Sequence, residues 1–269
     1  MTRILGTNAP KHYSARLAAP AYLAAALLLA GVAPAARQEN PATSASHQAK
    51  AAAPPAPAPR FDMLIRSDFF AGLAGDKDKF NRAMKLAEDT LAKDPKNAEA
   101  MVWHGGGVYF ESKDWYLQGD YLKGGQFMQD GLREMDDAVA LAPNDIAVLI
   151  PRAAVLLGSA PHVPMPDLAR QMFEKATGDY EKILRIQTAD FAAMQVHSRG
   201  ELLGALAEGW HALGEDEKSR GYLQRMVRDV PNSAYSKKAA ELLEAPPAKG
   251  PLGVVCLGCH VNPAQPATE

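Results

Sequence analysis

Three stretches of helical periodicity end in the same way, at a proline that is followed by a polar residue. These ends lie at Pro95, Pro143 and Pro231. Apolar residues recur three and four positions apart from Phe80 to Leu91, with charged residues between them, and similar stretches occur around residues 127–141, 167–186, 202–213 and 221–230. This spacing places the apolar side chains on one face of a helix, and proline then stops the helix. Because the chain from residue 61 to 245 has no convincing alternating strand pattern, we predict an all-α domain there.

The best single repeating unit covers residues 200–233. It resembles a tetratricopeptide repeat, a helical hairpin of about 34 residues. Gly214 would be the turn glycine, Ser219 the small residue where the two helices cross, Leu223 the large residue of the second helix, and Pro231 the end of the unit. The first-helix positions of the family are taken here by Leu203, Leu206, Ala207 and Trp210.

The spacing of the prolines departs from that family. Pro95 and Pro143 are 48 residues apart, and Pro143 and Pro231 are 88 apart. These distances exceed one and two repeats by roughly 14 and 20 residues. We expect the insertions around residues 111–124 and 158–166. The resemblance therefore implies a degenerate tetratricopeptide-repeat-like α-solenoid of three to four helical hairpins over residues 61–245.

Residues 1–36 have the pattern of a secretory signal peptide. Basic residues precede an uncharged, Ala/Leu-rich run from Leu17 to Ala36, and Ala33-Pro34-Ala35 offers a small-x-small cleavage site. The run could alternatively stay as a membrane anchor, although Pro20 and Gly31 weaken it as a span. We expect an exported, periplasmic protein with only a transient membrane contact. Residues 37–60 are rich in Ala and Pro and predict an extended, disordered linker.

The charge distribution argues against nucleic-acid binding. The chain has 29 basic and 31 acidic residues, but its first 60 residues hold six basic residues and one acid. The remainder has 23 basic and 30 acidic residues, a net charge of −7. Binding to phosphates needs a basic surface, so nucleic acid is not an expected partner.

The two cysteines lie in the sequence Cys256-Leu257-Gly258-Cys259-His260, within a C-terminal tail of residues 246–269. This spacing resembles the haem-attachment motif of c-type cytochromes. The resemblance implies one covalent haem c, held by thioethers from Cys256 and Cys259, with His260 as the proximal ligand of the iron. A redox-active disulfide and a zinc site remain alternatives, but the thioredoxin-like unit and the second cysteine pair that they use are missing.

The source of a sixth iron ligand is open. The nine residues after the motif contain no methionine, so we expect the haem to lie against the helical body, another subunit or solvent. The repeat register puts Glu201, Gly204, Glu208 and His211 on the concave face that such repeats use for ligands. His211 is the first candidate for a distal ligand, and Glu201, Glu208 and His211 are candidates for a partner-binding groove. His162 with Met165 comes second and His104 third; a five-coordinate iron is a further alternative.

The sequence thus predicts an exported monohaem c-type cytochrome-like protein for electron transfer, whose repeats bind or position a protein partner, expected to be a redox protein. The alternative is a periplasmic tetratricopeptide-repeat interaction scaffold with a minor redox or disulfide-forming tail. We find no motif for a haem peroxidase or another enzyme. The Pro/Gly joints beside the motif fit either a mobile haem arm or a docked one. Aromatic residues at helical spacing predict inter-helix core rather than a ligand box; they are Trp103, Tyr109, Phe110 and Trp115.

Overall fold

The computed structural model describes residues 60–247 and 250–255, all within the unit Ala56–Glu269. These residues form nine α-helices and two short 3₁₀ helices, and this part of the chain contains no β-strand. The predicted all-α fold is therefore confirmed. The α-helices are α1 (Phe61–Leu73), α2 (Lys77–Lys93), α3 (Ala98–Leu117), α4 (Tyr121–Leu141), α5 (Ile146–Ser159), α6 (Pro166–Ile186), α7 (Val196–Ala212), α8 (Asp216–Asp229) and α9 (Ala234–Glu244).

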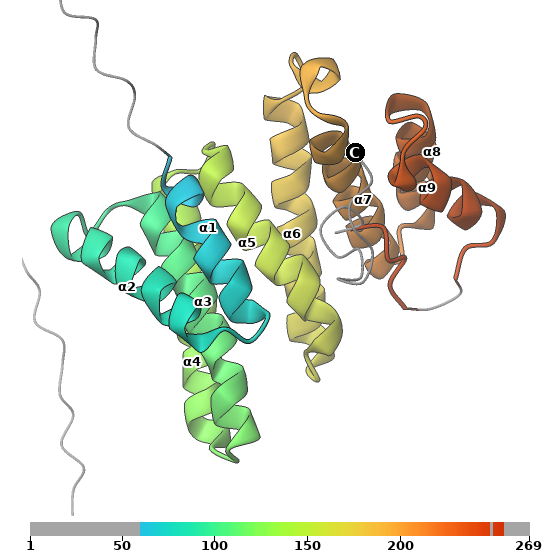
Figure 1. Ribbon diagram of the computed structural model, residues 1–269. Coiled ribbons are helices and arrows are strands. Elements are labelled where there is room, and N and C mark those ends of the chain that lie inside the picture. Colours follow the sequence, from blue (N-terminus) through green and yellow to red (C-terminus); the bar gives the residue numbers. More distant parts are fainter. Residues whose placement is uncertain (1–59, 248–249, 256–269) are drawn as a thin grey trace, which may run out of the picture. The chain divides into compact units, whose positions relative to one another are not determined.

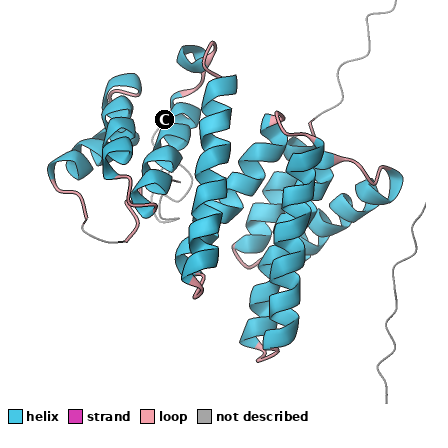
Figure 2. Cartoon of the chain, turned by 180° about the vertical axis from the view of Figure 1, so that it is seen from behind, coloured by secondary structure: helices cyan, strands magenta, loops and turns pink. Residues whose placement is uncertain are grey.

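Consecutive helices pair as hairpins, namely α1 with α2, α3 with α4, α5 with α6, and α7 with α8, while α9 packs on α8 (Figures 1 and 2). Each hairpin also contacts the next one through neighbouring helices. Such an arrangement is a helical repeat solenoid in which each unit buries an apolar face against its neighbours. Four hairpins and one closing helix thus make up the described part of the chain.

The helix boundaries follow from local sequence signals. Asp76, Asn97, Asp120 and Ser233 precede α2, α3, α4 and α9, and each side chain accepts a hydrogen bond from a backbone N–H of the first turn. These bonds satisfy donors that a helix start otherwise leaves unpaired. Each of the three prolines that the sequence analysis singled out lies in the turn after a helix; these helices are α2, α4 and α8.

The unit predicted over residues 200–233 corresponds to α7, α8 and the turn between them. Gly214 lies in this turn with a φ of +80°, a conformation that favours glycine. The Ser219 hydroxyl donates a hydrogen bond of 2.8 Å to the carbonyl of Ala207, so a small residue does mark the crossing of the two helices. Leu223 is buried in the cluster formed by α7, α8 and α9.

The two expected insertions take different forms. Residues 111–124 extend α3 and α4, which reach 20 and 21 residues and pack tightly against each other. A side chain at Gly131 could not fit there, because its Cβ would lie 2.5 Å from the carbonyl oxygen of Gly105. Residues 158–166 instead form the end of α5, a 3₁₀ turn and the start of α6.

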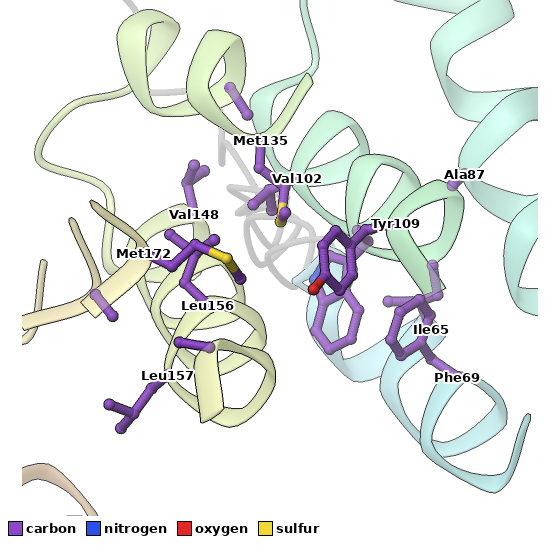
Figure 3. Close-up of a cluster of buried hydrophobic side chains, with 14 of the residues drawn as sticks. Ile65, Phe69, Ala87, Val102, Tyr109, Met135, Val148, Leu156, Leu157 and Met172 are labelled. Carbon is purple, nitrogen blue, oxygen red and sulfur yellow. The ribbon is translucent and has the colours of Figure 1, made fainter. Parts of the chain in front are cut away.

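The main hydrophobic core runs through α1 to α6 and includes Ala205 of α7. Figure 3 shows part of it, with Phe69 and Ile65 from α1 and Leu156 and Met172 from α5 and α6. Trp103 and Tyr109 are buried in this core, and the Trp103 ring centroid lies 5.0 Å from that of Phe69. For these two residues the prediction of inter-helix core is confirmed. Of the helices in this described part, none is long and apolar enough to cross a membrane.

Candidate functional site at the C-terminal arm

A short non-helical segment, residues 250–255, lies against α7; we call it the arm. Leu252 and Val254 are buried at 4% and 0% exposure and belong to the apolar cluster of α7, α8 and α9. Val255 is half-buried and packs against the main core instead. Burial of aliphatic side chains stabilises such a contact by about 1.5–3 kcal/mol each. The segment immediately before Cys256 is therefore docked on the helical body.

A buried carboxylate holds the backbone of the arm. Glu208 of α7 is only 6% exposed. Its Oε1 accepts a hydrogen bond of 2.8 Å from the backbone N–H of Leu252, and its Oε2 accepts one of 2.9 Å from Gly253. Hydrogen bonds to a charged group are stronger than neutral ones, and here they also satisfy a carboxylate that burial would otherwise penalise.

A glycine one turn earlier in α7 lets the arm approach the helix. A Cβ added at Gly204 would lie 2.7 Å from the carbonyl oxygen of Val254, closer than atoms pack. Glu208 thus contacts residues 252 and 253, and Gly204 contacts residue 254. The arm consequently runs along α7 from its C-terminal half toward its N-terminal end.

Gly204 and Glu208 belong to a row of positions on one face of α7, which we call the α7 stripe. The spacing of its members, four and three residues in turn, keeps them on the same side of the helix. The stripe consists of His197, Glu201, Gly204, Glu208 and His211. The sequence analysis identified the last four and missed His197. The same spacing continued by one step, from Glu201 to residue 197, would have found it.

At the N-terminal end of the stripe, a tyrosine of α9 joins two of its members. The Tyr235 hydroxyl donates a hydrogen bond of 2.5 Å to Oε1 of Glu201 and lies 2.8 Å from Nδ1 of His197. A hydroxyl has one proton, so a tyrosine that donates to Glu201 accepts from the Nδ1–H of His197. In the neutral ring this arrangement leaves the lone pair on Nε2.

At the other end of the stripe, His211 lies beside the start of the arm. Its Nδ1 is 3.1 Å from Oδ1 of Asp216, which is 77% exposed. With Leu252 and Leu242 it lines a hollow of about 330 Å³. That Glu201, Glu208 and His211 form a groove for a protein partner stays a prediction. Each of the three side chains has a hydrogen-bond partner within the chain.

The other two histidine candidates lie in different parts of the solenoid. Nδ1 of His104 in α3 is 2.8 Å from both carboxylate oxygens of Glu134 in α4. The hydrogen bond that the Nδ1–H of His104 donates to the Glu134 carboxylate is the main cause that raises the pKa of His104 above its ordinary value. His162 and Met165 precede α6 and line an apolar hollow of about 800 Å³ with residues of α3, α4 and α5, among them Tyr116.

Cys256, Cys259 and His260, the predicted haem residues, lie outside the described residues, as do the predicted signal peptide and nearly all of the linker. The described arm ends at Val255, the residue that precedes Cys256 in the chain. Within residues 60–247 and 250–255, no three His, Cys, Asp or Glu side chains cluster in a way that could hold a metal ion. The site consequently combines a docked arm and the motif that follows it directly.

Comparison of the chain with protein-family models, with curated proteins and with solved structures gave no match.

Proposed function

We propose that this protein is an exported monohaem c-type cytochrome-like electron carrier whose helical body binds or positions a redox partner. The observation that carries the proposal is the docked arm, whose last described residue, Val255, directly precedes the Cys256-x-x-Cys259-His260 motif in the chain. A motif at the end of a loose tail would leave a haem without protein around it. The arm instead places Val255, the residue before Cys256, on the helical body, next to the apolar cluster that Leu252 and Val254 form with α7, α8 and α9.

The roles of the motif residues follow from their chemistry. The thiols of Cys256 and Cys259 would each hold the haem through a thioether bond to one of its two vinyl groups, and an imidazole nitrogen of His260 would bind the iron. The bound haem would supply one-electron redox chemistry.

The surroundings of the arm fit such a group. Val254 is fully buried and Val255 packs on the main core, so the chain enters the motif from apolar surroundings. Apolar packing around a haem limits solvent access and tunes its potential. The carboxylate of Glu208 already accepts two hydrogen bonds from the arm backbone, so it would add no unpaired charge to the surroundings of a haem bound near the arm.

A partner-binding role of the body is supported by exposed apolar side chains at the tip of the α3–α4 hairpin. Leu117, Tyr121 and Leu122 are 75%, 73% and 76% exposed. Exposed apolar residues that gather in one place are typical of protein interaction sites. The same observation also supports the second candidate function, an exported repeat scaffold whose cysteine pair forms a disulfide or stays reduced.

The test is to export the full chain in cells that also express c-type haem maturation proteins. The purified protein is then analysed by haem staining on a denaturing gel and by oxidised and reduced visible spectra. We expect a covalent haem signal that Cys256→Ser and Cys259→Ser each weaken and the double variant abolishes. His260→Ala should change the spectrum, whereas His47→Ala in the linker should leave both readouts intact. A folded, exported protein without covalent haem would overturn the proposal in favour of the scaffold.

A further inference from the structure

The two insertions that lengthen the repeats meet at one hollow of the helical body. This apolar hollow of about 800 Å³ is bordered by α3, α4, α5 and the turn before α6. Of the sixteen residues that line it, five belong to the insertion at residues 111–124 and six to the insertion at residues 158–166. In repeat proteins, insertions commonly lie on the face that binds ligands. That both departures from the repeat length converge on one hollow favours a binding role over mere packing of the repeats.

The inner part of the apolar hollow offers hydrocarbon and carries no charge. Tyr109 and Met128 line it and are each 8% exposed. Burial is the main cause that raises the pKa of Tyr109, so its hydroxyl stays neutral there. The Ser112 hydroxyl is occupied, since it donates a hydrogen bond of 2.6 Å to the carbonyl of Tyr109. Met128 and Met165 add flexible thioether side chains, which adapt their shape to an apolar chain.

The rim of the apolar hollow carries basic side chains. Lys113 and His162 line it and are exposed, and none of the described residues that line it is Asp or Glu. Glu111 and Asp114 line a separate hollow beside α2, which Lys113 also borders, and Asp114 pairs with Lys77 at 3.9 Å. The ammonium of Lys113 has no ion pair within the described part of the chain.

This charge pattern differs from that of the protein around it. From residue 61 onward, acidic residues outnumber basic ones by 30 to 23. A hollow that is apolar inside, basic at its rim and free of lining acids is complementary to a molecule with a long hydrocarbon chain and one anionic end.

We propose that the apolar hollow binds a long-chain aliphatic carboxylate, whose chain lies against Met128 and Val155 and whose acid group lies at the rim near Lys113. The inference goes beyond the proposed electron transfer and does not depend on it, because no residue of the arm lines the hollow. A volume of about 800 Å³ is within the range of clefts that hold small molecules. Each CH₂ group that becomes buried should strengthen binding about fourfold.

The test measures binding of dodecanoate to the purified full-length protein by isothermal titration calorimetry, below the concentration at which the probe forms micelles. Two further probes separate the contributions of charge and chain. Dodecyltrimethylammonium keeps the chain length but is cationic, and hexanoate keeps the carboxylate but has a shorter chain. We expect saturable binding of one dodecanoate per chain. The cationic probe should bind about tenfold more weakly, and hexanoate about a hundredfold more weakly or less tightly still.

Two variants place the probe in the apolar hollow. Lys113→Gln should weaken dodecanoate binding about fivefold, whereas Lys93→Gln, at an exposed position of α2, should leave it unchanged. Gly158 lines the hollow, and a Cβ there would meet no atom within 4 Å, so Gly158→Leu should fill the hollow without disturbing α5. We expect it to weaken binding about tenfold or more. Gly178→Leu in α6 is the matched control, because this position is equally open but lies outside the hollow.

Thermal unfolding of both leucine variants checks that they remain folded. The proposal would be overturned by absence of saturable dodecanoate binding, by equal affinity for the cationic probe, or by unaltered affinity in folded Gly158→Leu. Equal weakening by Gly158→Leu and Gly178→Leu would also overturn it, because binding would then not be located in the apolar hollow. None of these readouts involves haem, so their outcome is distinguishable from that of the proposed electron transfer.

Discussion

Glu208 Oε1 accepts a hydrogen bond of 2.8 Å from the backbone N–H of Leu252, 44 positions later in the chain, and Oε2 takes the neighbouring N–H of Gly253. Recognition of backbone N–H groups by one carboxylate depends on the path of the arm rather than on its side chains. The side chains of Leu252 and Val254 contribute separately through burial. The arm is thus fixed by polar contacts to its backbone and apolar contacts to its side chains.

Glu208→Gln should loosen the arm. A glutamine can accept one hydrogen bond through its oxygen, but its NH₂ group faces the second backbone N–H and cannot accept from it. We expect a loss of about 1–3 kcal/mol in the free energy of unfolding. Amide exchange at Leu252 and Gly253 should also become faster. The measurements are denaturant unfolding and hydrogen exchange of the full chain.

The matched control for this variant is Glu88→Gln on the exposed face of α2. It should change stability by no more than about 0.5 kcal/mol. Equal stability and equal exchange rates in Glu208→Gln and the unmodified protein would mean that the two hydrogen bonds to Glu208 do not hold the arm.

Gly204→Ala should destabilise the protein although alanine is the better helix former. In an open helical position this replacement stabilises by about 0.5–1 kcal/mol. At Gly204 the new Cβ would lie 2.7 Å from the Val254 carbonyl oxygen, so the arm would have to move. Gly221→Ala in α8, where no atom lies within 4 Å, should show the ordinary stabilisation. Thermal unfolding of both variants checks the opposite signs; stabilisation of both would show that the arm does not press on α7.

The sequence predicted the helices best where local chemistry determines them. The range expected for the helix over 167–186 agrees with α6, Pro166–Ile186, because a proline opens it and apolar periodicity runs through it. The helix expected over 202–213 in fact begins at Val196. Its N-cap residue, Gln195, makes no side-chain cap, so the start carries no local signal.

The docking of the arm could not be predicted in the same way. Pro246, Pro247 and Pro251 mark a break in helical structure, and such a break fits a mobile segment and a docked one equally. The deciding contacts, Glu208 with Leu252 and Gly204 with Val254, join residues more than 40 positions apart. Local propensity carries no information about such pairs. His197 was missed for a related reason, since its contact with Tyr235 of α9 joins residues 38 positions apart.

The His104–Glu134 pair should make stability depend on pH. Its hydrogen bond raises the pKa of His104 above the ordinary value, so the folded state favours the protonated ring. The stabilisation is therefore fully present below about pH 6.5 and is lost as the pH rises through the folded-state pKa. We expect His104→Gln to be less stable than the unmodified protein at pH 5.5, with the difference shrinking toward pH 9. Denaturant unfolding across this range measures it, and a difference that grows with pH would contradict the pairing.

Asp179→Ala should be among the most destabilising substitutions in the helical body, because it leaves the buried guanidinium of Arg152 without its main partner. Arg152 of α5 is 11% exposed, and two of its nitrogens lie 2.7 and 2.8 Å from the carboxylate oxygens of Asp179 in α6. Removal of one partner from a buried ion pair costs about 3–5 kcal/mol. Asp136 of α4 still contacts Arg152 at 2.9 Å, so we expect the lower end of this range. Asp130→Ala is the control, since its partner Arg133 is 66% exposed and such pairs contribute at most about 1 kcal/mol. Denaturant unfolding should separate the two variants clearly, and equal losses would mean that Arg152 is adequately held by Asp136 alone.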